Sequence, residues 1–584
     1  MGGAEMTIKR RQFLQMALAG AVMGKATPTL ATGFGFPDNE SWTPRPSDLQ
    51  QGKVFRHGVA SGDPLHHSVI LWTRVTPKHD HIVPVECHVA TDPNMRRVIA
   101  RHIEFTGSQR DFTVKFEAHG LIPGETYYYQ FVALGEASPV GRTRTLPHYT
   151  NRVRLALASC SNWPAGFFAA YGHIARKEDL DAVVHVGDYI YEYANETFGN
   201  GTSIGRVPAP NKEILTLNDY RTRYAQYRTD PHLQAAHRQH PWIIVWDDHE
   251  IANDAWLNGA ENHNPELGEG DWQTRKRRAI RAWYEWQPVR DPQLFGDAPG
   301  RIYRSFQFGN LVKLDMLDTR HAGRDQQIPG LVDLNTLGLV HLDGTPEQVF
   351  AEISRRIAGY NNPERQLLGK EQEIWLAKQL LEPVSRATTW HVLGQQVMMG
   401  QLSVANAALP AGVRLPLNPD QWDGYAGARE RLLQFIQANG IRNVIVLTGD
   451  IHSSWANNVA RNPYAADFNP ARDSLAVEFV CPGISSPFFT NPNPQVVKGF
   501  ECIARANNPH TRFVDLEKNG YVVIDIDIYR ARSEWYHLDN VLNPDSAEAL
   551  VASVQVEAGK NYITQVDDRT GVPVPQCVQL VTGL

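Results

Sequence analysis

The sequence predicts an α/β domain preceded by a smaller all-β domain of the fibronectin or immunoglobulin type. Four short runs before His148 are rich in aromatic and β-branched residues and are separated by turn residues, as in antiparallel strands: residues 68–75, 84–90, 111–116 and 126–132. After His148, apolar runs alternate with helical patterns, which is typical of a domain with a buried sheet. The length of 584 residues also favours two domains over one hydrophobic core.

Residues 1–32 are predicted to be a targeting segment outside the fold. Arg10 and Arg11 precede a short apolar stretch, residues 16–24, and this order resembles a twin-arginine export signal. The stretch is too short for a permanent membrane helix. The alternative, the basic start of a cytosolic helix, is disfavoured because residues 24–39 are Gly-rich and polar. We therefore expect a periplasmic or extracellular protein that the twin-arginine machinery exports.

The predicted β-sandwich spans residues 49–148 and serves as a scaffold, and the predicted catalytic domain spans residues 150–545. The core strands of the catalytic domain are expected at residues 154–158, 182–186, 242–246, 311–317, 390–394 and 443–447. Its helices are expected at residues 167–180, 212–238, 273–286, 370–381 and 428–439. Two polar intervals, residues 258–271 and 325–362, are expected to be surface insertions. Residues 546–584 form a C-terminal segment that could cover the site.

Charge and cysteine content narrow the possible functions. Lys and Arg total 57 against 63 Asp and Glu, a net charge of -6, so we expect a monomer that forms no stable complex with nucleic acid. Five cysteines are an odd number for an oxidising compartment. Cys160 is the predicted unpaired thiol. Cys481 and Cys502 are the predicted pair because they are close in sequence, and the other pairings stay open.

Three predicted strands end near residues that can bind a metal ion. Cys160 ends one strand, Asp188 follows the second with Tyr191 beyond it, and Asp450 and His452 follow the third. Each residue alone has an ordinary explanation, such as a buried thiol, a turn or a packed ring. Strand ends meet at one edge of a sheet, however. Their joint position therefore indicates a metalloenzyme.

A fourth cluster follows the apolar residues 242–246. It offers the carboxylates of Asp247 and Asp248, the imidazole of His249 and the amide of Asn253. A solvated charged loop is the alternative. Because the cluster follows a fully apolar run, it is better explained as part of a site.

In this order, the motifs resemble the PhoD family of alkaline phosphatases and phosphodiesterases, metallophosphoesterases related to purple acid phosphatases. The motifs are Cys160-Ser-Asn, Gly187-Asp188-Tyr189-Ile-Tyr191-Glu, Trp246-Asp247-Asp248-His249-Glu250 and Thr448-Gly449-Asp450-Ile-His452. The resemblance covers nearly the whole mature chain, because the family also carries an N-terminal fibronectin-like module. It implies a four-layer α/β/β/α sandwich with the site at one edge.

The resemblance implies two metal ions. The implied ferric ligands are Cys160, Asp188, Tyr191 and His452. The implied ligands of a divalent ion, calcium in this family, are a bridging Asp188 with Asp248, Asn253 and Asp450. Donor chemistry supports the division, because thiolate and phenolate suit a highly charged transition metal, whereas carboxylate and amide oxygens suit calcium.

The resemblance also implies phosphoester hydrolysis by a hydroxide that two metal ions activate. Asp188 would bridge the ions, and His249 would assist the leaving oxygen or contact the substrate. Arg320, which ends another predicted strand, is expected to contact the phosphate. Three further arginines are candidates for the same contact, with an exposed basic helix face as the alternative: Arg221, Arg223 and Arg228.

The substrate and two rival functions stay open. The family hydrolyses monoesters and diesters, so small-molecule, nucleotide and lipid phosphoesters are all expected, including a phospholipase D-like reaction. Four aromatic residues could stack on a base or sugar: Trp163, Phe167, Tyr189 and Trp455. One rival is an iron oxidoreductase, which has no need of the oxygen-rich cluster. The other is a non-catalytic envelope binding protein, whose structural metal would be closed off by protein ligands.

Overall fold

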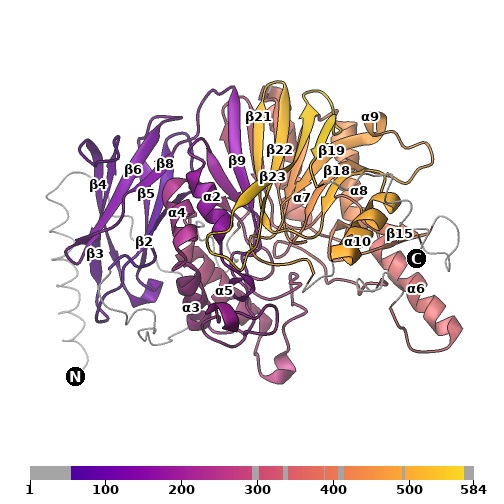
Figure 1. Ribbon diagram of the computed structural model, residues 1–584, viewed down its shortest axis with the longest axis horizontal. Coiled ribbons are helices and arrows are strands. Elements are labelled where there is room, and N and C mark those ends of the chain that lie inside the picture. The colour runs from indigo at the N-terminus through magenta and orange to yellow at the C-terminus, as the bar shows by residue number, and fades with distance from the viewer. Residues whose placement is uncertain are drawn as a thin grey trace, which may run out of the picture. The chain divides into compact units, whose positions relative to one another are not determined.

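A computed structural model describes residues 54–291, 301–332, 340–386, 388–405, 413–489 and 494–570 (Figure 1). The predicted export segment, residues 1–32, lies outside these ranges, as do residues 571–584 of the predicted C-terminal segment. Among the described residues, no helix is both long enough and apolar enough to cross a membrane.

Within the described ranges, the larger sheet holds ten strands in the order β24-β23-β22-β21-β9-β10-β11-β1-β2-β5. Its parallel centre is formed by β9 (Arg152–Ala158), β10 (Ala182–His185), β11 (Pro241–Ile244) and β1 (Val59–Gly62). The sheet continues through β2 (Ser68–Arg74) and β5 (Thr113–His119). Strands from the predicted β-sandwich thus belong to the same sheet as strands of the predicted catalytic domain.

The opposite end of the larger sheet comes from the C-terminal part of the chain. It consists of β21 (Gly520–Asp527), β22 (Arg530–Leu538), β23 (Glu548–Glu557) and β24 (Gln565–Asp568). These strands are antiparallel neighbours, and Figure 1 shows β21, β22 and β23 side by side next to β9. The described part of residues 546–584 therefore supplies β23 and the edge strand β24.

The remaining strands of the N-terminal region form a five-stranded sheet within the described ranges. Its members are β3 (Val83–Ala90), β4 (Val98–Thr106), β6 (Thr126–Ala133), β7 (Glu136–Ala137) and β8 (Gly141–Arg144). Burial alternates along β6, as expected for a strand with one face in a core. Tyr129 and Phe131 of β6 pack in one cluster with Leu71 of β2 and Phe116 of β5, so this sheet and the larger sheet share a core.

The second main sheet holds seven described strands in the order β12-β13-β14-β17-β19-β18-β20. They are β12 (Arg304–Phe308), β13 (Val312–Met316), β14 (Trp390–Gly394), β17 (Val444–Thr448), β18 (Ser454–Ala460), β19 (Ser474–Val480) and β20 (Thr511–Asp515). Val392 and Ile445 of this sheet share a buried cluster with Leu155 and Val183 of the larger sheet. The two main sheets therefore pack face to face.

Helices cover the other face of the second sheet. Side chains alternate between the two faces of a strand, so Leu393 and Val446 point away from the larger sheet and into a separate cluster. That cluster contains Leu380 of α7 (Lys370–Arg386) and Leu433 of α8 (Ala426–Ala438). Three further described helices and a two-stranded antiparallel sheet lie outside these layers: α6 (Pro346–Tyr360), α9 (Pro470–Asp473), α10 (Pro494–Asn507), and β15 (Ser403–Ala405) with β16 (Arg414–Pro416).

Four described helices share the core of the larger sheet: α2 (Ala169–Arg176), α3 (Leu217–Tyr227), α4 (Pro231–Gln239) and α5 (Trp272–Trp286). One continuous helix was expected over residues 212–238, but the structure has α3 and α4. Pro231 cannot donate an intrahelical hydrogen bond and therefore begins a new helix. Asp230 caps that helix by accepting from the backbone N–H groups of His232 and Leu233.

The cysteines do not pair as the sequence predicted. Cys481 is a free, buried thiol, whereas Cys502 of α10 is disulfide-bonded. The Sγ of Cys481 lies 3.3 Å from the Oγ of Ser159, because the end of β19 turns this side chain towards the end of β9. Nearness in sequence was therefore a poor guide. Cys160 is unpaired, as predicted.

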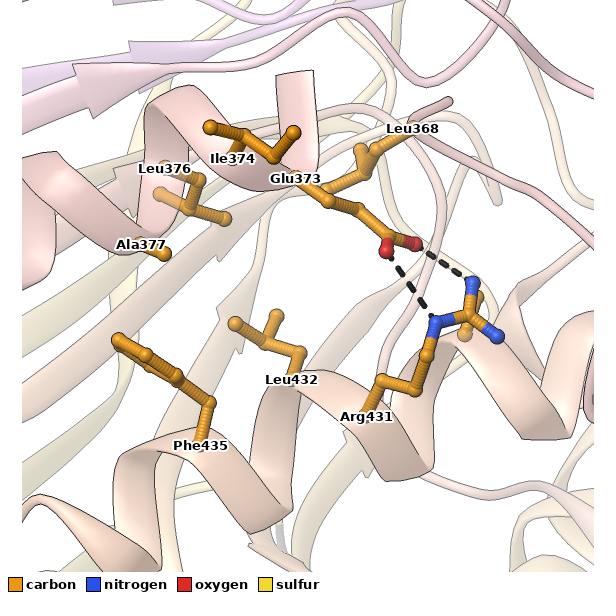
Figure 2. Close-up of a pocket in the computed structure, with 9 residues that line it drawn as sticks. Leu368, Glu373, Ile374, Leu376, Ala377, Arg431, Leu432 and Phe435 are labelled. Carbon is orange, nitrogen blue, oxygen red and sulfur yellow. Dashed lines mark hydrogen bonds and ion pairs between the residues drawn. The ribbon is translucent and has the colours of Figure 1, made fainter. Parts of the chain in front are cut away.

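An apolar cavity of about 240 Å³ lies between α7 and α8 (Figure 2). Leu376, Leu432 and Phe435 line it, and an ion pair closes one side, with 2.6 Å between Arg431 Nη2 and Glu373 Oε1. Its lining contains none of the residues predicted for metal binding or catalysis.

Candidate metal centre

The carboxyl ends of strands from both main sheets bring the predicted ferric ligands together. Cys160 follows β9, Asp188 follows β10, and His452 follows β17. Ligand atoms of these three residues lie within 4.8 Å of one another. The hydroxyl of Tyr191 lies 2.9 Å from Asp188 Oδ2 and 3.0 Å from His452 Nε2. One thiol, one phenol, one carboxylate and one imidazole thus share a site between the sheets.

The backbone at these positions is strained. Cys160, Asp188, Asp450 and His452 have φ angles of 62°, 56°, 62° and 56°. The left-handed conformation costs a non-glycine residue about 1–2 kcal/mol. Such strain persists only where the surroundings enforce it, and it concentrates at functional sites. Four strained residues in one cluster therefore mark this region as functional.

Two glycines permit the close approach of the ligand-bearing turns. A Cβ on Gly187 would lie 2.5 Å from the backbone nitrogen of Asp247, and a Cβ on Gly449 would lie 2.6 Å from Ser159 Oγ. Both contacts are far below van der Waals distance, so a larger residue would force the turns apart.

A carboxylate cluster adjoins the thiol. Ligand atoms of Asp247, Asp248 and Asp450 lie within 4.8 Å of one another, as do those of Asp188, Asp248 and His249. Among the described residues, Asp188 Oδ1, Asp247 Oδ2 and Asp248 Oδ1 are buried without a hydrogen-bond partner. Buried carboxylate oxygens are costly when left unpaired. The donor set therefore fits two cations that share Asp188.

Burial and negative charge also raise the pKa values of groups in the site. Burial, with the nearby Asp188 carboxylate as the second cause, raises the pKa of Cys160 and of Tyr191 well above its ordinary value. Burial likewise raises the pKa of Asp450 to about 6. These groups resist deprotonation because the cluster has too much negative charge and too little water. A bound cation would reverse the effect.

Arg320 differs from its predicted role. Its guanidinium is completely buried. Nε lies 2.5 Å from Asp247 Oδ1, Nη1 lies 2.8 Å from Asp420 Oδ2, and Nη2 pairs with Asp450. Because carboxylates occupy it on three sides, Arg320 serves here as their counter-charge and does not face a substrate phosphate.

The three other candidate arginines are also engaged elsewhere. Arg221 pairs with Glu285 at 2.6 Å. Arg223 donates to backbone carbonyl oxygens, including that of Tyr191. The guanidinium of Arg228 lies 4.1 Å from the ring centroid of Trp72. All three are buried, so they are neither phosphate contacts nor an exposed basic face.

Two glutamates in the motifs were given no role by the sequence analysis. The carboxylate of Glu250 accepts from the backbone N–H groups of Asp188, Tyr189 and Asp247 at 3.1, 2.7 and 2.8 Å, and so joins two ligand-bearing turns. The other is Glu192, whose Oε2 lies 2.7 Å from His249 Nδ1. Their positions within the motifs were the only available signal.

The remaining predicted ligand, Asn253, lies on the loop after β11. Its backbone N–H donates to Glu192 Oε1 at 2.7 Å, and its side-chain amide donates to Glu261 Oε2 at 3.2 Å. The next residue, Asp254, donates its backbone N–H to Asp248 Oδ2 at 2.6 Å. Asn253 is thus next to the carboxylate cluster.

Most of the predicted stacking residues are buried: Trp163, Tyr189 and Trp455. They have no face free for a base or sugar. Tyr193 and Phe198, which the sequence analysis did not name, are half-buried. The ring of Tyr193 lies 5.4 Å from that of His249, and the ring of Phe198 stacks 5.8 Å from that of His452.

Comparison with known proteins identifies the family of the chain. Residues 155–535 match the family model for the PhoD-like phosphatase, and residues 41–147 match the model for the PhoD-like phosphatase N-terminal domain. The chain belongs to the PhoD-like phosphatase family. The predicted resemblance is therefore confirmed, and the protein is a phosphoric ester hydrolase with a mixed α/β fold of several sheets.

Two known proteins are similar to this chain over most of its length. Alkaline phosphatase D of Bacillus subtilis (strain 168) is 34% identical over 580 residues, which cover 97% of this chain and 90% of that protein. The solved structure described as "Structure of PhoD" superposes with a TM-score of 0.73 at 33% identity, covering 89% of this chain and 93% of that chain.

Proposed function

We propose that this protein is an exported phosphoesterase of the alkaline phosphatase D type that uses two metal ions to hydrolyse phosphomonoesters, phosphodiesters or both. One observation carries the proposal: the Asp188 carboxylate belongs both to the cluster with the thiol and imidazole and to the cluster with Asp248. A carboxylate shared in this way is suited to bridging two cations.

The two clusters differ in the cations that they suit. The proposed ferric ligands are Cys160, Asp188, Tyr191 and His452. The proposed calcium ligands are Asp188, Asp248, Asn253 and Asp450. Bound there, the ions would supply an activated water and positive charge for the phosphate oxygens. Of the chain's own groups, the imidazole of His249 would give a proton to the leaving oxygen.

For the architecture, we propose the four-layer α/β/β/α sandwich, with a scaffold module at residues 49–148 and a catalytic region at residues 150–545. The core shared by the two main sheets supports the inner layers. The cluster that joins α7 and α8 to the second sheet supports one outer layer, and the helices in the core of the larger sheet support the other.

For location, we propose export by the twin-arginine route to the periplasm or the cell exterior. The paired Arg10 and Arg11 before an apolar stretch support export. The disulfide of Cys502 supports an oxidising compartment. The proposed partners are the export machinery and a small phosphoester substrate.

The test is hydrolysis of p-nitrophenyl phosphate and of its bis-ester at alkaline pH by the metal-loaded protein. Asp188→Asn should abolish turnover of both esters and lower the bound iron and calcium, measured by elemental analysis. Asp343→Asn, at a fully exposed side chain, is the matched control. The proposal fails if the wild type hydrolyses neither ester or if Asp188→Asn keeps its activity.

A further inference from the structure

Glu192 is a fully buried carboxylate with no role in the function proposed above. It is 0% exposed, and its hydrogen bonds engage both oxygens. Oε2 accepts from Nδ1 of His249 at 2.7 Å. Oε1 accepts from the backbone N–H of Asn253 at 2.7 Å and from the side-chain amide of Asn262 at 3.0 Å. Burying a carboxylate is costly unless such partners satisfy it, so the arrangement is specific.

The same contacts fix the imidazole of His249. The ring of Tyr191 lies against it, with centroids 4.2 Å apart and planes inclined by 31°. The ring of Tyr193 meets it edge-on at 5.4 Å. These rings fix the plane of the imidazole. The hydrogen bond from Nδ1 to Glu192 fixes its orientation within that plane and leaves Nε2 on the side of the ring away from Glu192.

The imidazole of His249 lies beside the candidate metal centre. A nitrogen of His249 lies within 4.8 Å of carboxylate oxygens of Asp188 and Asp248. Because Nδ1 is bound to Glu192, Nε2 is the nitrogen left for chemistry at this site. A histidine whose second nitrogen is held by a carboxylate has a fixed tautomer and ring orientation.

We propose that Glu192 is a positioning residue, which holds the imidazole of His249 with Nε2 facing the oxygen that leaves phosphorus. This inference rests on the proposed function, in which a P–O bond is hydrolysed. The oxygen of water forms a bond to phosphorus while the bond to the leaving oxygen breaks. That oxygen takes the proton from Nε2, and a proton from the attacking water restores the imidazole. One ester and one water give one alcohol and one phosphate.

Glu192 also connects the imidazole to the loop of the second proposed cation. Through Oε1 it fixes the backbone of Asn253, a proposed calcium ligand, and it reaches Asn262 in the polar insertion of residues 258–271. The insertion is therefore attached to the site by the same carboxylate that orients His249.

The test is the leaving-group dependence of kcat in Glu192→Gln. An anion as stable as p-nitrophenolate leaves without a proton, whereas an alkoxide needs one. We expect kcat to change little for p-nitrophenyl phosphate and to fall about 10²-fold or more for an alkyl phosphate, in the range ascribed to general acid catalysis. KM should stay near that of the wild type. Glu192→Asp should recover part of the loss.

Glu261→Gln is the matched control, because this exposed carboxylate accepts from the Asn253 side chain and not from His249. Its kcat values on the two esters should stay near those of the wild type. Equal losses of kcat on both esters in Glu192→Gln would overturn the inference. If that variant does not fold, the same esters are tested with His249→Gln, and equal losses there would overturn it as well. Absence of any hydrolysis by the wild type would instead refute the proposed function.

Discussion

The role of Arg320 as counter-charge can be tested by Arg320→Gln. The guanidinium is completely buried and pairs with Asp247, Asp420 and Asp450, and its Nη2 lies 3.6 Å from Asp248 Oδ1. Glutamine keeps hydrogen-bonding capacity but removes the positive charge. The substitution therefore leaves buried carboxylates facing one another without compensation.

The expected loss of folding free energy is about 3–5 kcal/mol in the metal-free protein, the usual effect of removing one partner of a buried ion pair. The loss of folding free energy should not grow in proportion to the number of carboxylates that pair with Arg320. Burial raises the pKa of Asp247 well above its ordinary value, so this carboxyl can stay protonated and uncharged in the variant. A bound divalent cation would supply charge to Asp248 and Asp450. Calcium at 100 times its Kd stabilises any folded form that binds it by about 2.7 kcal/mol, the wild type included. Without the guanidinium the carboxylates should bind calcium more tightly than in the wild type, so excess calcium should narrow the difference in stability between the two proteins.

The assay is urea unfolding of wild type and variant, in a chelator and in excess calcium. Arg324→Gln is the control, since Arg324 pairs with Asp420, which would keep its bond to Arg320. The control should lose less stability, and calcium should not narrow its difference from the wild type. The reasoning is refuted if Arg320→Gln loses less than about 1 kcal/mol in the chelator, or if calcium affects both variants equally.

Two further predictions concern backbone and pH. Gly187→Ala should reduce metal content and kcat, because the backbone at φ +108° is forbidden to alanine and the new Cβ would lie 2.5 Å from the Asp247 nitrogen. The control is Gly205→Ala, with φ +69° and no described atom within 4 Å of the new Cβ, which should keep both metal content and kcat. Equal effects of the two substitutions would contradict the steric argument. Burial lowers the pKa of His510 from 6.5 to about 4, so between these pH values the unfolded chain binds the proton more readily than the folded chain. The contribution of the buried neutral imidazole to folding stability is therefore complete above pH 6.5 and decreases as the pH falls to 4. In His510→Gln the decline measured by urea unfolding between pH 7 and 4.5 should be shallower, and an unchanged slope would show that His510 does not contribute.

The proximity of the predicted ligands could be anticipated because part of its information is local. An apolar run followed by a chelating residue marks a strand end, and parallel strand ends meet. Cys160, Asp188 and His452 were named on this basis, and the structure places them within 4.8 Å of one another. The rule accounts for Cys160 and Asp188, whose strands are neighbours, whereas His452 follows β17 of the other main sheet. The pairing of strands is not local. Residues Ser61 and Gly62 pair with Pro241 and Trp242, far along the chain, and the pattern of side chains in β1 does not specify that neighbour.

The arginines show a different limit of sequence analysis. A guanidinium recognises carboxylate and phosphate by the same two-point geometry, so Arg320 at a strand end is compatible with either partner. The choice depends on whether carboxylates from other elements reach it first. Asp420 and Asp450 do so in the fold, and neither position is near Arg320 in sequence. The same reason explains why Cys481 does not pair with Cys502: its thiol lies next to Ser159, which follows β9 and is distant in sequence.

The site contains several features that cost folding free energy, and packing of the two main sheets must compensate for them. Four residues hold left-handed backbone, three carboxylates lie within 4.8 Å of one another, and Arg320 is the guanidinium that faces Asp247, Asp248 and Asp450. Asp188 follows β10 of the larger sheet and Asp450 follows β17 of the second sheet, so a cation held by both would relieve repulsion and also connect the sheets. Metal loading should therefore stabilise both sheets together, and a chelator should lower hydrogen-exchange protection in β10 and β17 alike. Loss of protection in one strand alone would mean that the cations do not connect the sheets.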